Sequence, residues 1–304
     1  MMKFFEDAQL GNVLDYESVM NALDEAYADL ARGQAAILPR QRCAAGSAKF
    51  SSMGALWAAR GVAATKSYTT VNGQFSFLIN LFDTVANRSL AVMDAQEITR
   101  FRTAAQTAMV AARIKPARVG KVALLGAGLQ GRAQIEALSA RITFDELAIV
   151  DPHISQLPAM DLNGSPQTRL CAAQEAVEGA DIVITATRSQ TPVLDGNWLK
   201  DDALVVAIGI SSAGGRELDT RSLDRASRVI VEWKPQSMQE AGDVLFWLKD
   251  LPHQATKIVD LPELYAAQWP QATGIQVFKS VGTGLADTAT AWLAWQRLAE
   301  KAAA

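Results

Sequence analysis

The sequence is poor in the residue types that most often build metal centres and disulfide frameworks. Its 304 residues include only two cysteines, Cys43 and Cys171, and two histidines, His153 and His253. So few ligands exclude a Cys/His zinc site of the usual spacing. They also imply no disulfide framework, so we expect no metal, a cytoplasmic protein and two cysteines that act as small buried apolar side chains. A Ser-His-Asp triad would need one of the histidines, and neither has the expected neighbours.

An excess of charge and long apolar runs are also missing. The 29 Lys and Arg residues nearly balance the 32 Asp and Glu residues, for a net charge of -3. This balance gives nucleic acids and anionic membranes no general electrostatic attraction to the chain. No uncharged stretch approaches the ~18 apolar residues of a membrane-spanning helix, and the acidic start MMKFFEDAQL is unlike a signal peptide. We therefore expect a small-molecule partner, with neither nucleic acid nor membrane.

The first third of the chain predicts a helix followed by antiparallel strands. Apolar residues recur on one face over residues 16–32, which predicts an amphipathic helix that stops at Gly33. Short runs rich in Val, Ile, Thr and aromatic residues fill residues 35–95, separated by Gly, Asn and Asp, and predict an antiparallel meander. A second helix is expected over about 97–114, because Pro116 follows it.

From residue 121 onward, strand and helix patterns alternate. Near-continuous apolar segments such as KVALL, ELAIVD, DIVITAT and ALVVAIGI are separated by helical segments, which is typical of a parallel sheet covered on both faces. A last helix over 283–300 follows the final strand, and we expect it to pack back on the first domain. The fold class is therefore α/β, with a Rossmann-type doubly wound domain over 116–282 and a discontinuous α+β domain over 1–115 and 283–304.

A glycine-rich turn stands between the first of these strands and its helix. It fits G-x-G-x-x-G with Gly126, Ala127, Gly128, Leu129, Gln130 and Gly131. In a dinucleotide-binding turn, the first glycine permits the tight turn, the second lets the backbone approach a pyrophosphate, and the third lets helix and strand pack closely. The N–H groups at the helix N-terminus then favour phosphates. We predict a dinucleotide site here; the alternative is a glycine turn in a non-binding α/β domain.

Asp151 ends the next strand, 20 residues beyond Gly131. A carboxylate there would accept hydrogen bonds from the adenosine ribose and repel a 2′-phosphate, which favours NADH over NADPH. Neither Lys nor Arg follows Asp151 directly. His153 and Arg132 could each still contact a 2′-phosphate, so use of both cofactors is an alternative. The alternative for Asp151 is a turn or helix-start residue.

The ends of the later strands supply further candidates for the cofactor site. Thr185 and Thr187 end one strand and Gly209 ends the next. Ligands of open α/β sheets lie beyond the carboxyl ends of the strands, so these residues are expected to border the nicotinamide. They can also be plain strand ends.

Three cations occupy otherwise apolar segments of the first domain. They are Arg40 in ILPRQ, Lys66 in VAATKSY and Arg102 in ITRFRTAA. Each alone can simply extend to solvent while its aliphatic stem packs on the protein. Together they can hold a carboxylate.

The whole pattern resembles the ornithine cyclodeaminase/mu-crystallin family over nearly the full chain. The matching segments are LPRQ, the Met53 region with ATKS, INLFD, LAVMDAQEITRFRTAA, LLGAGLQGRAQIEAL, DIVITATRSQTPVL, GISSAGGRELD, QEAGDVL and VFKSVGTGLADTA. The resemblance implies a homodimer in which residues 1–115 and 283–304 form the substrate-binding and dimerisation domain. It also implies that Arg40, Met53, Lys66 and Arg102 bind the substrate, with its carboxylate held by the three cations. Thr103 would lie near the cofactor, and Asp287 would cap or orient a helix near the domain junction.

The reaction depends on one position within GISSAGGRELD. Ser211 stands where cyclodeaminases and related alanine dehydrogenases of this family carry an aspartate. A serine hydroxyl cannot accept a proton near neutral pH as a carboxylate can. The resemblance therefore favours the ketimine reductases, which also carry serine there.

We expect an enzyme that reduces Δ1-pyrroline-2-carboxylate, Δ1-piperideine-2-carboxylate or both to L-proline or L-pipecolate, with NADH or NADPH. Ser211 would orient the imine nitrogen and Lys66 would supply or relay a proton. The alternatives are an ornithine cyclodeaminase, an alanine dehydrogenase-like enzyme, or a non-catalytic ligand-binding protein similar to mu-crystallin.

Overall fold

The computed structural model describes residues 3–303 and divides into two compact units. The first unit comprises the residues up to 105 together with those from 283 onward, and the second comprises residues 106–282. Helix α3 (Gln96–Ile114) contributes residues to both units. The second unit thus takes in the C-terminal part of α3, which the sequence-based division at residue 115 assigned to the first domain.

The first unit is built on a six-stranded sheet. Its strand order is β1-β6-β5-β4-β3-β2, with bounds β1 (Lys3–Phe5), β2 (Ala35–Ala45), β3 (Ala48–Trp57), β4 (Val62–Val71), β5 (Gln74–Asp83) and β6 (Arg88–Asp94). Strands β2 to β6 pair antiparallel with their neighbours, so the predicted meander is confirmed. Strand β1 was not expected; it pairs parallel with β6 at the edge.

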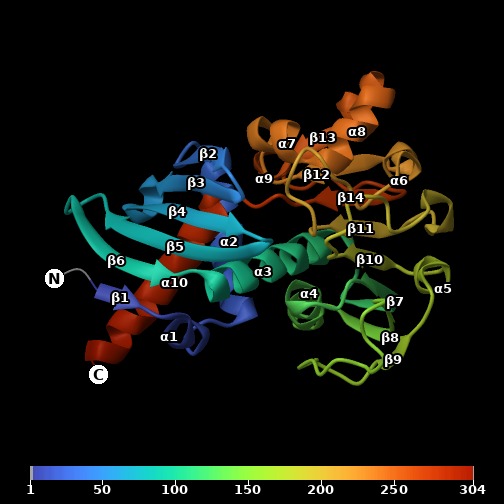
Figure 1. Ribbon diagram of the computed structural model, residues 1–304, viewed down its shortest axis with the longest axis horizontal. Helices are drawn as coiled ribbons and strands as arrows, with labels where there is room; N and C mark the ends of the chain where they lie inside the picture. Colours follow the sequence, from blue (N-terminus) through green and yellow to red (C-terminus); the bar gives the residue numbers. More distant parts are fainter. Residues whose placement is uncertain (1–2, 304) are drawn as a thin grey trace. The chain divides into compact units, whose positions relative to one another are not determined.

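Two long helices cover one face of this sheet. Helix α2 (Tyr16–Ala31) begins at Asp15, whose side chain accepts a hydrogen bond from the Ser18 N–H at 2.8 Å. Helix α10 (Gly284–Ala303) packs against α2 and against strands β2 to β5, crossing behind the strands in Figure 1. The last helix therefore joins the first unit, as expected. A short helix, α1 (Asp7–Gly11), links β1 to α2.

Strand β2 contains a bulge next to strand β3. Leu38 lies opposite Gly54 but Gln41 lies opposite Ser52, so β2 carries one extra residue around Pro39. Proline has no N–H for the ladder, and it is tolerated here because β2 is an edge strand. Beyond the bulge β2 runs along the exposed edge, where Cys43 is exposed. The expectation that this cysteine is buried is therefore wrong.

The second unit is a parallel eight-stranded sheet. Its order is β13-β12-β14-β11-β10-β7-β8-β9, with bounds β7 (Arg118–Leu125), β8 (Thr143–Val150), β9 (Gln167–Leu170), β10 (Ile182–Thr185), β11 (Leu204–Ala207), β12 (Arg228–Val231), β13 (Ile258–Asp260) and β14 (Gln276–Lys279). The chain moves outward from β7 through β8 to β9, then returns to add β10 on the other side of β7. This reversal is the switch point of a doubly wound sheet, so the predicted Rossmann-type fold is confirmed.

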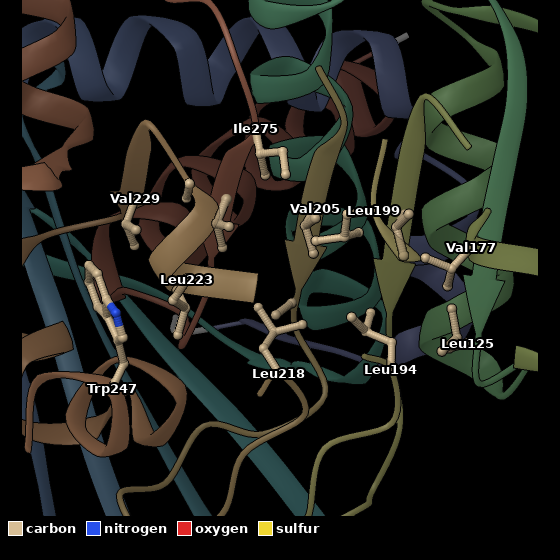
Figure 2. Close-up of a cluster of buried hydrophobic side chains, with 14 of the residues drawn as sticks. Leu125, Val177, Leu194, Leu199, Val205, Leu218, Leu223, Val229, Trp247 and Ile275 are labelled. Carbon is tan, nitrogen blue, oxygen red and sulfur yellow. The ribbon is translucent and has the colours of Figure 1, made fainter. Parts of the chain in front are cut away.

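Apolar strands and short helices form the core of this unit. The helices are α4 (Leu129–Ser139), α5 (Ala173–Val177), α6 (Thr220–Arg225), α7 (Lys234–Glu240), α8 (Gly242–Asp250) and α9 (Leu261–Ala266). Figure 2 shows one buried cluster, in which Leu125, Val205 and Val229 of the strands gather with Leu223 of α6 and Trp247 of α8. Strands buried on both faces explain the near-continuous apolar runs. Helices α6 to α9 and β13 were not predicted, because they are too short to show a periodic pattern.

Among the described residues, none of the helices is both long enough and apolar enough to cross a lipid bilayer.

Candidate active site

A buried cluster of opposite charges lies in the first unit. Lys66 of β4 donates hydrogen bonds to Asp287 Oδ1 at 3.0 Å and to Thr99 Oγ1 at 2.5 Å. Arg102 of α3 donates from Nε to the same Asp287 oxygen at 3.1 Å. Lys66, Arg102 and Asp287 are only 2%, 7% and 1% exposed. The Asp287 carboxylate therefore forms ion pairs with two buried cations.

The bulge in β2 adds Arg40 to this cluster. Lys66 lies opposite Met53 of β3, and Arg40 Nε lies 3.2 Å from Met53 Sδ. The extra residue in β2 is what turns Arg40 toward Met53, because a bulge reverses the alternation of side chains along a strand. The four predicted substrate-binding residues, Arg40, Met53, Lys66 and Arg102, thus come together within one unit.

The pKa values in the cluster follow from burial and from these charges. Burial lowers the pKa of Lys66 to about 8; the Asp287 carboxylate opposes this, while Arg102 and Arg40 add to it. Burial alone would raise the pKa of Asp287, but Lys66 and Arg102 outweigh it and hold that pKa below its ordinary value. At neutral pH the cluster thus combines an ionised Asp287, a mostly protonated Lys66 and two arginines. Its net charge is positive, which suits a small anion.

Thr103 also lies in the first unit, one helical turn from Thr99. Its hydroxyl donates to the Thr99 carbonyl at 2.7 Å. The hydroxyl proton is therefore used within α3, and the oxygen keeps its capacity as an acceptor. The other predicted cofactor-binding residues all belong to the second unit.

The glycine turn after β7 has the geometry that a dinucleotide requires. Gly126 has a φ of 94°, and a Cβ on Gly131 would lie 1.9 Å from the Gly126 carbonyl oxygen. Gly128 is the N-cap of α4 with no side-chain cap, and a Cβ there would meet nothing within 4 Å. The start of α4 is therefore open to a phosphate.

Two further observations support the fit of a dinucleotide. In the first turn of α4, the buried Gln130 Oε1 has no hydrogen-bond partner, so it is available to a bound polar group. Leu129 beside it is exposed. The residues of the turn thus offer backbone N–H groups, a free amide oxygen and an apolar side chain, which suit NADH or NADPH.

Asp151 follows β8 directly and supports this turn. Its carboxylate accepts hydrogen bonds from the Ala127 N–H and the His153 N–H, both at 2.9 Å. Sequence reasoning gave this residue either a ribose contact or a turn role. The structure shows the turn role, and the two oxygens retain lone pairs for ribose hydroxyls.

The strand ends that were expected to border the nicotinamide lie in a row next to the glycine turn. A Cβ on Gly126 would lie 2.7 Å from the Ala186 carbonyl oxygen and 3.0 Å from Thr187 Cγ2. A Cβ on Gly209 would in turn lie 2.1 Å from the Thr187 carbonyl oxygen. Thr185 is fully buried at the end of β10, and Ser211 is exposed in the loop after β11. The predicted cofactor-binding residues of this unit therefore form one continuous edge at the switch point.

Sequence reasoning missed the contacts of two acidic residues. Asp287 was expected to cap or orient a helix and instead pairs with Lys66 and Arg102. Glu217 was not considered, yet its side chain accepts hydrogen bonds from the Thr187 and Gly209 N–H groups. Asp287 lies in an apolar helical stretch, GLADTATAWLA, and an isolated charge in such a stretch is the signal that could have identified it.

Comparisons with known proteins place this chain in a family. The model of the ornithine cyclodeaminase/mu-crystallin family matches residues 1–302. The mouse (Mus musculus) protein named ketimine reductase mu-crystallin is 32% identical over 217 residues, which cover 71% of this chain and 67% of the mouse protein.

Solved structures show the same fold. The structure of a probable ornithine cyclodeaminase from Bordetella pertussis Tohama I superposes with a TM-score of 0.91 at 37% identity, covering 99% of this chain and 98% of the other. The Δ1-pyrroline-2-carboxylate reductase of Thermococcus litoralis, in complex with NADH and L-proline, has a TM-score of 0.89 at 22% identity, with 99% and 98% coverage. The match to the family model includes both the cation cluster and the glycine turn, so the chain belongs to the ornithine cyclodeaminase/mu-crystallin family, as an NAD(P)H-dependent oxidoreductase.

Proposed function

We propose that this chain reduces a cyclic ketimine, Δ1-pyrroline-2-carboxylate, its six-membered homologue Δ1-piperideine-2-carboxylate, or both, to L-proline or L-pipecolate. The observation that carries the proposal is the buried cluster in which Lys66 and Arg102 share Asp287, with Arg40 beside them. Three cations around one carboxylate leave a positive charge for the substrate carboxylate. The ketimine reductase name of the mouse relative agrees with this choice.

The first and second units would have different roles in the reaction. The first would hold the substrate, because Arg40 and Arg102 can bind its carboxylate and so fix the direction of the C=N bond. The second would hold the dinucleotide at the glycine turn after β7. NAD(P)H supplies the hydride when bound. We also propose that NADH is preferred, because the carboxylate of Asp151 beside the turn would repel a 2′-phosphate.

Lys66 is the proposed proton source. A cyclic imine accepts hydride best when its nitrogen is protonated, and the product amine keeps that proton. With its pKa lowered to about 8 by burial, Lys66 is still mostly protonated at neutral pH but gives up its proton far more readily than an ordinary lysine. Ser211, in the loop after β11, would orient the ring nitrogen through its hydroxyl.

The first test follows NADH and NADPH oxidation with each of the two ketimines. We expect turnover by the unmodified chain, and a KM for the ketimine raised about 10-fold or more by Arg102→Gln, because a hydrogen bond to a charged group is lost. Arg297→Gln is the matched control: this arginine of α10 belongs to the same unit but pairs with Asp15 at the surface. Absence of oxidation with both ketimines refutes the proposal, and tight ketimine binding without turnover would indicate a ligand-binding protein.

Ornithine cyclodeamination is the second candidate. The Bordetella structure named a probable ornithine cyclodeaminase is 37% identical to this chain. The serine at position 211 argues against this activity, since it cannot act as the base that attack by the ornithine amine needs. Ammonia release from ornithine without net change in NADH would establish it, and ammonia-dependent reduction of pyruvate would instead indicate an alanine dehydrogenase.

We further propose that the chain forms a homodimer through the uncovered face of the six-stranded sheet. Helices α2 and α10 pack on the other face. The strand registers place seven exposed apolar side chains on the uncovered face: Phe4, Leu38, Phe50, Leu56, Val71, Leu78 and Phe82. An apolar surface of this extent is rare on a monomer and typical of an interface.

Sedimentation velocity tests the dimer. Leu56 and Phe82 flank Ala63 in one cross-strand row, so Leu56→Lys with Phe82→Lys places two like charges in a row that crosses three neighbouring strands of the proposed interface. We expect this double variant to sediment as a monomer and the unmodified chain as a dimer. Equal sedimentation of the two would show that this face is not the interface.

A further inference from the structure

Three of the charged side chains that are completely buried in the second unit form a connected triad. Glu217, Asp243 and Lys279 are each 0% exposed. Lys279 ends β14, and its Nζ lies 2.8 Å from Asp243 Oδ2 near the start of α8. The other oxygen of Asp243 accepts hydrogen bonds from the backbone N–H groups of Glu217 and Leu218 at 2.7 and 2.8 Å. Asp243 thus links Lys279 to the segment that carries Glu217.

The outward contacts of this triad all go to the loops after β10 and β11. Glu217 Oε1 accepts from both the N–H and the hydroxyl of Thr187, each at 2.7 Å. Glu217 Oε2 accepts from the Gly209 N–H at 2.7 Å. Lys279 donates to the Ile210 carbonyl at 2.6 Å. The peptide group that precedes Gly209 and the one that follows Ile210 are therefore held by side chains that both contact Asp243 or the backbone it binds.

Stability alone does not explain such an arrangement. Burying charges carries a desolvation penalty, and apolar side chains in the same place are often as stable or more so. Burial raises the pKa of Glu217 even though the Lys279 charge and the Thr187 hydrogen bonds oppose it. The benefit that remains is geometric, since charged hydrogen bonds fix a backbone more tightly than neutral ones do.

The backbone that the triad holds belongs to the cofactor edge of the sheet. Thr187 touches the Gly126 turn on one side and Gly209 on the other, with a Cβ on Gly209 reaching 2.1 Å from the Thr187 carbonyl oxygen. Asp151, on the ribose side, follows β8 on the opposite side of β7. The loops after β10 and β11 therefore lie on the side of the switch point that is left for the nicotinamide.

We propose that Glu217, Asp243 and Lys279 are positioning residues that fix Thr187, the Gly209 N–H and the Ile210 carbonyl, and through them Ser211, at the nicotinamide end of the dinucleotide site. The proposal rests on the assignment of this edge under the proposed function. It assigns the triad no contact with substrate; its effect passes through the backbone that it holds.

The test compares the binding of NADH with that of ADP-ribose, which lacks the nicotinamide. Glu217→Gln keeps the shape of the side chain but turns an N–H group toward the donors, so the loops must shift. By calorimetry we expect NADH to bind about 10-fold more weakly, with ADP-ribose affinity unchanged. With a ketimine substrate, kcat falls by up to about 100-fold, the scale of a 1 Å misplacement, while KM for the ketimine stays the same.

Asp260→Asn is the matched control. Asp260 is also a buried carboxylate that accepts backbone N–H groups, from Lys234 and Glu263, but it lies on the edge strand β13. It should lower the melting temperature without changing the ratio of the two affinities. Should Glu217→Gln fail to fold, Lys279→Gln, which keeps an N–H donor near Ile210, provides the same comparison.

Equal weakening of NADH and ADP-ribose, or no change in either, overturns the proposal. Neither binding measurement needs a substrate. A chain that reduces no ketimine but shows the expected affinity ratio would therefore refute the proposed function while supporting the positioning role.

Discussion

Replacing Asp287 with asparagine should move the pH range in which the enzyme works. Asp287 Oδ1 lies 3.0 Å from Lys66 Nζ and 3.1 Å from Arg102 Nε, and all three side chains are nearly inaccessible. Asparagine has almost the same shape but no charge. The change therefore removes the attraction that keeps the proton on Lys66 and leaves the repulsion from Arg102 and Arg40 in place.

The magnitude follows from Coulomb's law. Two unit charges about 4 Å apart attract by about 4 kcal/mol at an effective permittivity near 20, and one pKa unit corresponds to about 1.4 kcal/mol. Even if relaxation cancels half of this attraction, the pKa of Lys66 should fall by at least about one unit from its value of about 8. At neutral pH about half or more of the variant would then have lost the proton that Lys66 is proposed to supply.

The assay is the pH dependence of kcat/KM for ketimine reduction. In the unmodified chain kcat/KM should decrease as the pH rises through about 8, because Lys66 loses its proton there. In Asp287→Asn the same decrease should occur at least about one unit lower, with activity recovered toward pH 6. The substrate's own titration contributes equally to both profiles, so the difference between them reports on Lys66.

Asp15→Asn provides the control. Asp15 caps α2 and pairs with Arg297 at the surface of the same unit, and asparagine is an equally good cap. Its profile should coincide with that of the unmodified chain. An Asp287→Asn profile that does not move, or that rises with pH through 8, would refute Lys66 as the proton source.

Three other predictions use the same structure. The pKa of Lys66 is about 8 when folded against 10.5 for an ordinary lysine, so the unfolded chain binds the extra proton between these values. The free energy of unfolding should therefore rise with pH across that window, and Lys66→Met should remove this part of the rise in urea titrations. Gly131→Ala should destabilise the fold by about 1–3 kcal/mol because its Cβ would strike the Gly126 carbonyl. Gly128→Ala should lower the melting temperature less than Gly131→Ala does, because its Cβ enters open space and only the N-cap of α4 is weakened, but it should weaken NADH binding; equal melting temperatures for the two variants would contradict this reading. Asp151→Ser should raise the NADPH-to-NADH ratio of kcat/KM, and an unchanged ratio would show that the carboxylate only supports the turn.

Much of the fold was predictable because its signals are local. The spacing of the glycines from Gly126 to Gly131, placed between an apolar strand and a helix, identified the dinucleotide turn. The alternation of short strands over residues 35–95 identified the meander that the structure contains. These patterns depend on neighbours within a few residues, which a single sequence displays directly.

The contacts that assemble the site join residues far apart in the sequence, and they could not be predicted from the sequence alone. Arg40 approaches Met53 only because β2 carries a bulge, and strand register is a property of two strands together. Asp287 is 221 residues from Lys66 in sequence, so their pairing depends on the last helix returning to the first sheet. Glu217 looked like an ordinary acidic residue, since nothing nearby in sequence shows that its partners are Thr187 and Gly209.

The bulge at Pro39 has a consequence beyond the direction of Arg40. Strand β2 is the outermost strand of its sheet, and a long, regular outermost strand invites other chains to extend the sheet in solution. A proline without an N–H, together with an extra residue, breaks the regular spacing of free backbone groups halfway along this strand. The irregularity that brings Arg40 next to Met53 is thus also expected to disfavour open-ended sheet growth from β2, in agreement with the proposal that the chain associates through its apolar face and not through the edge of the sheet.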